Sequence, residues 1–314
     1  IRRGIKLEKQ NKFVKDMTKG NPMQLLIQFS LPLLVGNIFQ QLYNMVDSII
    51  VGNFVGANAL GAIGTTNSLN FFFFSLVAGL SVGIGIIVAQ YFGFGDEEKV
   101  KDAIGNSIWI ITICSVIMAI IGFVTARPIL VLLDTDPVIL NDAVAYLKVV
   151  SIGIVCVGFY NGVSGILRAL GDSKTPLIFL IVASVLNVIL DLIFVLSFGW
   201  GVVGAGVATA FSQLISALAC IIYAYKSNTY FKLKKKNIKL NGNIIKKSCK
   251  LGIPVALQNS LIAFSLIVLQ KVVNGYGATF TTAFTVVSRI ETLVQQPFMS
   301  LGAAVSTYTG QNIG

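Results

Sequence analysis

The chain has 314 residues, of which 55% are hydrophobic and only 12% charged, with a mean hydropathy of +0.81. Soluble domains carry charge on roughly a quarter of their residues, so this composition excludes an ordinary soluble domain and indicates a membrane protein. The sequence contains no His, which excludes imidazole metal sites, Ser-His triads and His proton relays. The net charge of +11 raises nucleic-acid binding as an alternative, but the basic residues lie outside the apolar runs, as expected beside a membrane.

Apolar runs between charged or Gly/Pro-rich breaks predict eight membrane-spanning helices. Because such runs recur along the whole chain, neither a signal peptide nor a single anchor explains them. We expect Pro32 in the first helix and Pro254 in the seventh to kink them. In chain order the predicted helices cover residues 22–52, 59–92, 104–126, 138–168, 175–198, 204–225, 249–273 and 280–310.

The distribution of Lys and Arg orients these helices. Seven basic residues precede the first helix and nine lie in residues 226–250. Six helices separate the two segments, so both lie on one side of the membrane, which the positive-inside rule makes the cytoplasmic side. We therefore expect a multi-pass protein of the bacterial cytoplasmic (inner) membrane with a cytoplasmic N-terminus. The chain opens on Ile1, and we expect Met17 to be the natural start.

Comparing the chain with itself at an offset of 221 or 222 residues reveals an internal repeat. The aligned pairs include Pro32 with Pro254, Gln90 with Gln311 and Gly93 with Gly314. Since six helices separate the copies, both enter the membrane in the same direction, as in transporters that rock two bundles about a central site. Chance alignment of apolar helices is the alternative.

The repeat predicts an all-α, polytopic bundle in four parts. Residues 1–21 form a cytoplasmic N-terminal segment, and residues 22–225 form a complete six-helix bundle. Residues 226–248 are a basic cytoplasmic linker, and residues 249–314 are the first two helices of an incomplete second bundle. We expect four more helices beyond Gly314.

Two carboxylates lie inside the apolar runs. Asp47 is the only charged residue of the first two predicted helices, and Asp191 is the only one of the fifth and sixth. Both helices start in the cytoplasm and carry the acid toward their outer ends, so we expect the two acids at similar depth. Asn187 lies one helical turn before Asp191, and Thr209 falls at the same level of the following helix.

An oxygen-rich cluster of Asp47, Asn187, Asp191 and Thr209 suits a proton or a hard cation such as Na⁺. Two close carboxylates in a low dielectric are unstable unless a proton or a cation neutralises one of them. We therefore predict ion coupling at these four residues. The simpler alternative is that each acid is hydrated near the headgroups and that the amide and hydroxyl make ordinary interhelical bonds.

Four further polar residues are predicted to line a cavity: Gln40, Tyr43, Arg289 and Glu291. Arg289 and Glu291 are two residues apart on one helix, so they point to different faces and do not pair directly. Glu291 is placed to attract cationic ligands. Structural pairing with helices beyond Gly314 is the alternative.

The stretch SLPLLVGNIFQQLYNMVDSIIVGNFVGANALGAIG resembles the multidrug and toxic compound extrusion (MATE) family, as do RALGDSKTP, NVILD and the AQYFG and GQNIG ends. The similarity runs from Met17 to Gly314. It implies twelve helices in two six-helix bundles around a V-shaped cavity, with export of organic cations, dyes and antibiotics driven by inward Na⁺ or H⁺ flow. We expect cationic amphipathic substrates, no cofactor beyond the coupling ion, and a monomer in the bilayer.

In the DinF-like branch of this family, the coupling-ion positions correspond to Asp47, Asn187, Asp191 and Thr209. Other branches carry a glutamate in the seventh helix. The stretch VALQNSLIAF after Pro254 has no acid, which argues against a coupling site in that helix.

The main rival function is a lipid-linked oligosaccharide flippase of the same wider superfamily. It needs a cavity rich in Arg or Lys for pyrophosphate, and Arg289 is the single strong candidate. A passive channel is a further alternative, although two parallel bundles favour alternating access. Intramembrane enzymes need clustered acids such as DDxxD or a catalytic His, and neither pattern is present.

Overall fold

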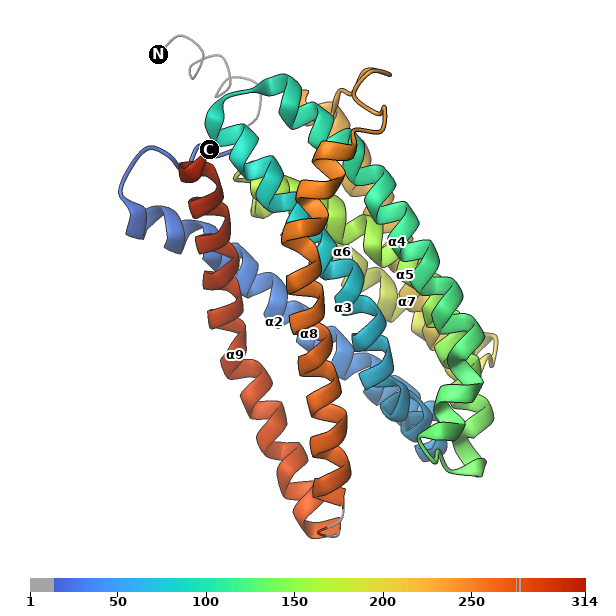
Figure 1. The fold of residues 1–314 in the computed structure, drawn as a ribbon. Helices are drawn as coiled ribbons and strands as arrows, with labels where there is room; N and C mark the ends of the chain where they lie inside the picture. The colour runs from blue at the N-terminus through green and yellow to red at the C-terminus, as the bar shows by residue number, and fades with distance from the viewer. Residues whose placement is uncertain (1–13, 275, 277) are drawn as a thin grey trace.

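The computed structural model describes residues 14–314 except 275 and 277, and leaves out some side chains between residues 267 and 289. The described residues form eight long helices, a π-helix and a 3-10 turn, and contain no strand (Figure 1). In chain order these are α2 Pro22–Phe54, α3 Ala57–Phe94, α4 Glu97–Leu132, α5 Pro137–Ala169, α6 Lys174–Asp191, π-helix Leu192–Ser197, α7 Gly201–Ser227, 3-10 turn Thr229–Phe231, α8 Gly242–Asn274 and α9 Ala278–Ile313. The predicted all-α fold of eight helices is confirmed.

α4 and α8 begin about two turns earlier than the apolar runs do. The side chain of Asp96 accepts a hydrogen bond from the backbone N–H of Lys99 (3.1 Å). In the same way, Asn241 accepts one from the backbone N–H of Asn243 (3.1 Å). The polar residues that precede these two apolar runs therefore form the capped first turns of α4 and α8. The sequence had placed them in loops.

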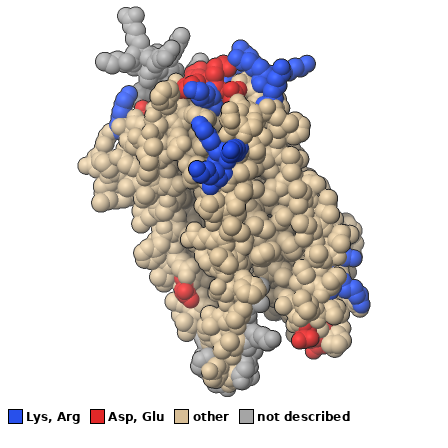
Figure 2. Space-filling view, viewed as in Figure 1, with Lys and Arg blue, Asp and Glu red and all other residues tan. Residues whose placement is uncertain are grey.

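Among the described residues, seven of the long helices are long and apolar enough to cross a membrane, and α9 is not among them. The start of α2, the α3–α4 turn and the linker of residues 228–241 lie together at one end of the bundle, which we call the basic end (Figure 1). Lys and Arg side chains gather there in Figure 2, while the middle of the visible face is nearly free of charge.

α3 lies in the centre of the molecule and contacts α4, α5, α8 and α9. Its contact with α8 runs through small residues. A Cβ added to Gly79 would lie 2.6 Å from the Cβ of Ala256, and one added to Gly83 would lie 2.5 Å from the carbonyl oxygen of Ser248. Small residues let two membrane helices bring their backbones into contact, which is how these two helices associate in the absence of a hydrophobic driving force.

Gly79→Ala is expected to destabilise the protein by about 1–3 kcal/mol, the cost of overpacking, because the backbone of α8 leaves no room for a methyl group. The measurement is the unfolding temperature of the detergent-solubilised protein. Gly64→Ala is the matched control on the same helix, since its new Cβ would meet nothing within 4 Å. Equal unfolding temperatures for the two variants would contradict the close contact between α3 and α8.

The repeat predicted from the sequence appears in the structure as a reciprocal contact at the basic end. A Cβ on Gly93 would collide with the carbonyl oxygen of Gln311, and a Cβ on Gly314 would collide with the carbonyl oxygen of Gln90. The offset of 221 residues aligns Gln90 with Gln311 and Gly93 with Gly314, so each contact joins a residue of one copy to the counterpart of its partner in the other. A two-fold axis produces such reciprocal contacts, because it exchanges each residue with the matching residue of the other copy.

The N-terminal segment is packed between the two halves of the repeat at this end. Met17 is fully buried and packs with Phe29 of α2 and Ala304 of α9. Its backbone N–H donates to Oε1 of Gln311 (2.8 Å), and Nε2 of Gln311 donates to the carbonyl oxygen of Ala169 (2.8 Å). One side chain thus connects the N-terminal segment, α9 and the end of α5.

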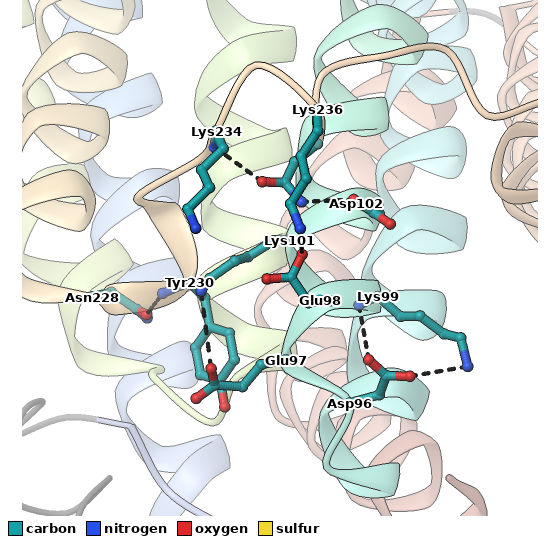
Figure 3. A network of polar contacts seen from close by, with 11 residues as sticks. Asp96, Glu97, Glu98, Lys99, Lys101, Asp102, Asn228, Tyr230, Lys234 and Lys236 are labelled. Carbon is teal, nitrogen blue, oxygen red and sulfur yellow. Dashed lines mark hydrogen bonds and ion pairs between the residues drawn. The ribbon is translucent and has the colours of Figure 1, made fainter.

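The basic linker is docked along α4 (Figure 3). Asn237 is 1% exposed, and its Nδ2 donates to Oδ1 of Asp102 (2.7 Å). Asn106 is fully buried and accepts a bond from the linker backbone (2.8 Å). Lys236 pairs with Glu98 (2.7 Å), which lowers the pKa of the Glu98 carboxyl and raises that of the Lys236 ammonium. Because this pair is exposed, it contributes little, and the buried amides hold the linker.

Asn237→Ala is expected to release the linker, because it removes the part-buried hydrogen bond to the carboxylate of Asp102, a loss of roughly 1–3 kcal/mol. Limited trypsin digestion should then cleave the linker lysines several times faster than in the unmodified protein. The control is Asn243→Ala, whose side chain is exposed. If both variants are cut at the unmodified rate, the buried amide does not hold the linker.

Candidate ion-coupling site

Three helices each present two polar side chains one turn apart. They are Tyr43 and Asp47 on α2, Asn187 and Asp191 on α6, and Thr209 and Gln213 on α7. A spacing of four residues puts the members of each pair on one face of their helix. α2 and α7 both contact α6, so the three faces meet inside the first six helices.

The structure brings the four predicted residues together. Asp191 is fully buried and Asn187 is 1% exposed. Nδ2 of Asn187 lies 3.4 Å from Oγ1 of Thr209. The carboxyl groups of Asp47 and Asp191 are close enough to share a hydrogen bond when one of them is protonated. Their proximity is therefore observed, while their role in coupling stays a prediction.

The cluster is rich in acceptors that have no donor. Among the described residues, nine buried side-chain polar atoms lack a hydrogen-bond partner, and five of them are oxygens of this cluster. They are Oδ1 of Asp47, Oδ1 of Asn187, both carboxyl oxygens of Asp191 and Oε1 of Gln213. None of the four ion pairs among the described residues includes Asp47 or Asp191. Buried acceptors without a donor are costly, so these oxygens favour a hydrogen-bond donor or a positively charged species beside them.

Asp191 also marks a change in helix geometry. α6 ends at this residue and continues as the π-helix Leu192–Ser197, with a bond from the N–H of Phe198 to the carbonyl oxygen of Ile193 (3.0 Å). π-Helical segments concentrate at functional sites, because the wider turn displaces the backbone next to them. The turn between the π-helix and α7 contains Trp200, which stacks on Phe194 with ring centroids 5.3 Å apart.

The sequence reading missed two residues of the cluster. Tyr146 of α5 is 7% exposed and lies near Asp47, Asp191 and Tyr43. Gln213 of α7 is 6% exposed and approaches the hydroxyl of Tyr43. A signal for Gln213 was present, since it follows Thr209 by one helical turn in a run without charge. Tyr146 carried no such signal, because an isolated tyrosine in a helix is usually a packing residue.

The other predicted residues lie outside the cluster or at its edge. Gln40 is half-buried and lies beside Tyr43. Glu291 is exposed on α9 and accepts a hydrogen bond from Nε2 of Gln295 (3.0 Å). The side chain of Arg289 lies outside the described residues.

The two prolines predicted to kink their helices belong to α2 and α8. Pro32 and Pro254 both lie inside continuous helices. Among the described residues, no group of three or more His, Cys, Asp or Glu is placed to hold a metal ion.

Comparisons with known proteins place the chain in a family. The model of the MatE family matches residues 32–193, a stretch that contains Asp47, Asn187 and Asp191. The chain belongs to the MatE family. This stretch ends before α7, so Thr209 and Gln213 lie outside it.

Relatives of the MatE chain are similar along nearly all of it. The chain is 34% identical over 300 residues to the "Probable multidrug resistance protein YpnP" of Bacillus subtilis, covering 95% of this chain and 67% of the relative. A structure of a MOP superfamily transporter from Pyrococcus furiosus superimposes with a TM-score of 0.89 at 27% identity, covering 97% of this chain and 67% of that one. An outward-facing multidrug resistance MATE family transporter gives a TM-score of 0.88 at 27% identity, with the same coverage of 97% and 67%. The MatE chain thus spans about two thirds of the length of these relatives.

Proposed function

We propose that this MatE chain belongs to a secondary antiporter that exports organic cations across the bacterial cytoplasmic membrane, driven by inward H⁺ or Na⁺ flow. The observation that carries the proposal is the pair of fully buried Asp191 and half-buried Asp47, surrounded by acceptor oxygens and without a basic partner among the described residues. Ionisable residues inside a membrane mark ion and substrate pathways. The relatives are named as multidrug resistance and export proteins, which supports transport over catalysis.

The cluster is placed to act as a switch between two conformations. Two contacting carboxylates in a low dielectric repel each other, so loss of a proton or cation costs energy unless the helices move apart or admit water. Asp191 joins α6 to the π-helix, and Asp47 lies in the outer half of α2, so occupancy of the cluster acts on the outer ends of both helices. An ion that binds one conformation better shifts the equilibrium toward it.

The contacts of the basic end are suited to alternating access. The two halves of the repeat meet there through Met17, Gln311 and the reciprocal glycine contacts. Farther along, Oγ of Ser300 on α9 accepts a bond from Asn37 of α2 (3.2 Å), and the described residues of α9 before Ser300 are exposed or half-buried. We propose that this arrangement is the outward-open one, with the basic end closed and cytoplasmic.

The substrate class follows from charge and surface chemistry. Gln40 and Tyr43 are half-buried beside the acid pair, and Glu291 is an exposed acid on α9. A site of aromatic faces, amides and acids attracts a cationic amphipath. We propose such compounds as substrates and a monomer in the lipid bilayer as the working form.

The test is efflux of ethidium from everted membrane vesicles that contain the full-length protein, with an imposed Na⁺ gradient, an imposed pH gradient, or neither. Uptake of ethidium into the vesicles is expected with at least one of the gradients and not without a gradient. Transport that needs ATP and ignores both gradients would contradict the proposal.

A further inference from the structure

Gln213 lies at the cluster and is not explained by packing. It is 6% exposed, and its Oε1 has no hydrogen-bond donor among the described residues. A buried glutamine that serves only the fold normally has both ends of its amide paired. Gln311 illustrates this in the same molecule, because it is 1% exposed and its oxygen and nitrogen each have a partner at 2.8 Å.

The neighbours of Gln213 place it at the ion-coupling cluster. It follows Thr209 by four residues on α7, and Thr209 contacts Asn187 of α6. On its other side, its amide approaches the hydroxyl of Tyr43, which shares a face of α2 with Asp47. Gln213 therefore closes the cluster on the side of the membrane centre, since α7 runs from the outer turn toward the basic end.

The number and kind of oxygens without donors distinguish between the two coupling ions. A single proton satisfies one oxygen and its immediate partner. A hard cation, in contrast, accepts several oxygen ligands at once, and transporters hold Na⁺ with carboxylate and neutral carbonyl oxygens together. Two of the five oxygens belong to neutral amides, Asn187 and Gln213, which neither bind nor release a proton near neutral pH.

We propose that Oε1 of Gln213 is a ligand of a Na⁺ ion held by the cluster, and that this neutral oxygen makes the site favour Na⁺ over H⁺. The proposal rests on the coupling function proposed above and adds a residue and an ion preference to it. If Gln213 is removed, the remaining oxygens that lack a donor belong to the two acids and one amide. The preference of the site then shifts from Na⁺ toward H⁺. Replacing the amide by an apolar side chain of similar length should therefore weaken Na⁺ binding without removing the response to pH.

The experiment measures the rise in unfolding temperature of the purified full-length protein as NaCl replaces choline chloride at constant ionic strength and pH. A second titration follows the same temperature against pH in choline chloride alone. The variants are Gln213→Met, Gln213→Asn and Asp191→Asn. The matched control is Ser216→Ala, a fully buried polar residue of α7 whose hydroxyl is paired with the carbonyl oxygen of Phe179 (2.8 Å). Asparagine keeps an amide on a shorter side chain, so its oxygen lies farther from the cluster. Gln213→Asn is therefore used in place of Gln213→Met if Gln213→Met does not fold.

Gln213→Met or Gln213→Asn is expected to raise the half-maximal Na⁺ concentration by at least about tenfold, the usual worth of one bond to a charged group. Ser216→Ala is expected to stay within about twofold of the unmodified protein, well below that tenfold effect. A Na⁺ response that is unchanged in the Gln213 variants, equally reduced in Ser216→Ala, or missing from the unmodified protein overturns the assignment of Gln213. The proposed function is separately contradicted if Asp191→Asn leaves both the Na⁺ and the pH responses intact.

Discussion

Asp191→Asn is expected to remove most of the gradient-driven ethidium efflux while leaving the protein folded in the membrane, and Asp47→Asn is expected to do the same. Asparagine keeps the shape of the side chain but carries no charge, so binding or loss of the coupling ion no longer changes the repulsion inside the cluster. Coupling free energies are typically about 1–3 kcal/mol, so the gradient dependence of efflux should fall roughly 5- to 150-fold. The measurement is the initial rate of transport in everted vesicles, normalised to the amount of protein.

Asp142→Asn is the control for this experiment. Asp142 lies on α5, is exposed, and belongs neither to the cluster nor to any of the four ion pairs among the described residues. Its replacement should leave efflux unchanged. Unaltered transport in both Asp47→Asn and Asp191→Asn would show that the buried acids do not couple the ion to export.

Gln311→Leu is expected to open the basic end. The change leaves the backbone N–H of Met17 without its acceptor and the carbonyl oxygen of Ala169 without its donor, and both bonds are buried. Each such loss costs roughly 1–3 kcal/mol, and every 1.4 kcal/mol corresponds to about a tenfold change in an equilibrium. The population with a closed basic end should therefore fall by at least about tenfold relative to the open one.

Distances between two spin labels measure this opening. The labels are placed at Glu97→Cys on α4 and Ile313→Cys on α9, both exposed, in a background without the four native cysteines. Gln311→Leu should move the distance distribution to longer values. Gln295→Leu, which removes an exposed glutamine of the same helix, should not. Identical distributions for the two variants would mean that Gln311 does not hold the basic end closed.

Much of the architecture was predictable, because a bilayer imposes strong rules on sequence. A span needs about 20 apolar residues, and the eight apolar runs therefore located the eight helices. Their ends were less predictable. Asp96 and Asn241 are polar residues that resemble loop residues in composition, and only their capping bonds show that helices begin there. Charged first turns extend α4 and α8 beyond the apolar boundaries on which the prediction depended.

The candidate site was predictable in part and for a definite reason. An acid in a long uncharged run is conspicuous, which identified Asp47 and Asp191, and helical spacing then added Asn187. Tyr146 was missed because it belongs to α5, and nothing local to its sequence indicates that α5 passes the acid pair. Glu291 is also an acid in an apolar stretch, but the structure places it exposed on α9 and outside the cluster. A conspicuous acid in the sequence is therefore not always a site residue.

The sequence by itself determined that the chain is an all-helical membrane protein, where its helices run, and which residues repeat at an offset of 221. These properties depend on hydropathy and on the period of the helix, both of which are local along the chain. Only the tertiary structure decided that Gln213 and Tyr146 belong to the cluster and that Gln311 connects the N-terminal segment to α5 and α9. Such contacts join residues up to 294 positions apart. They depend on the close approach of helix backbones at small residues such as Gly79 and Gly93, and no local pattern specifies the partner.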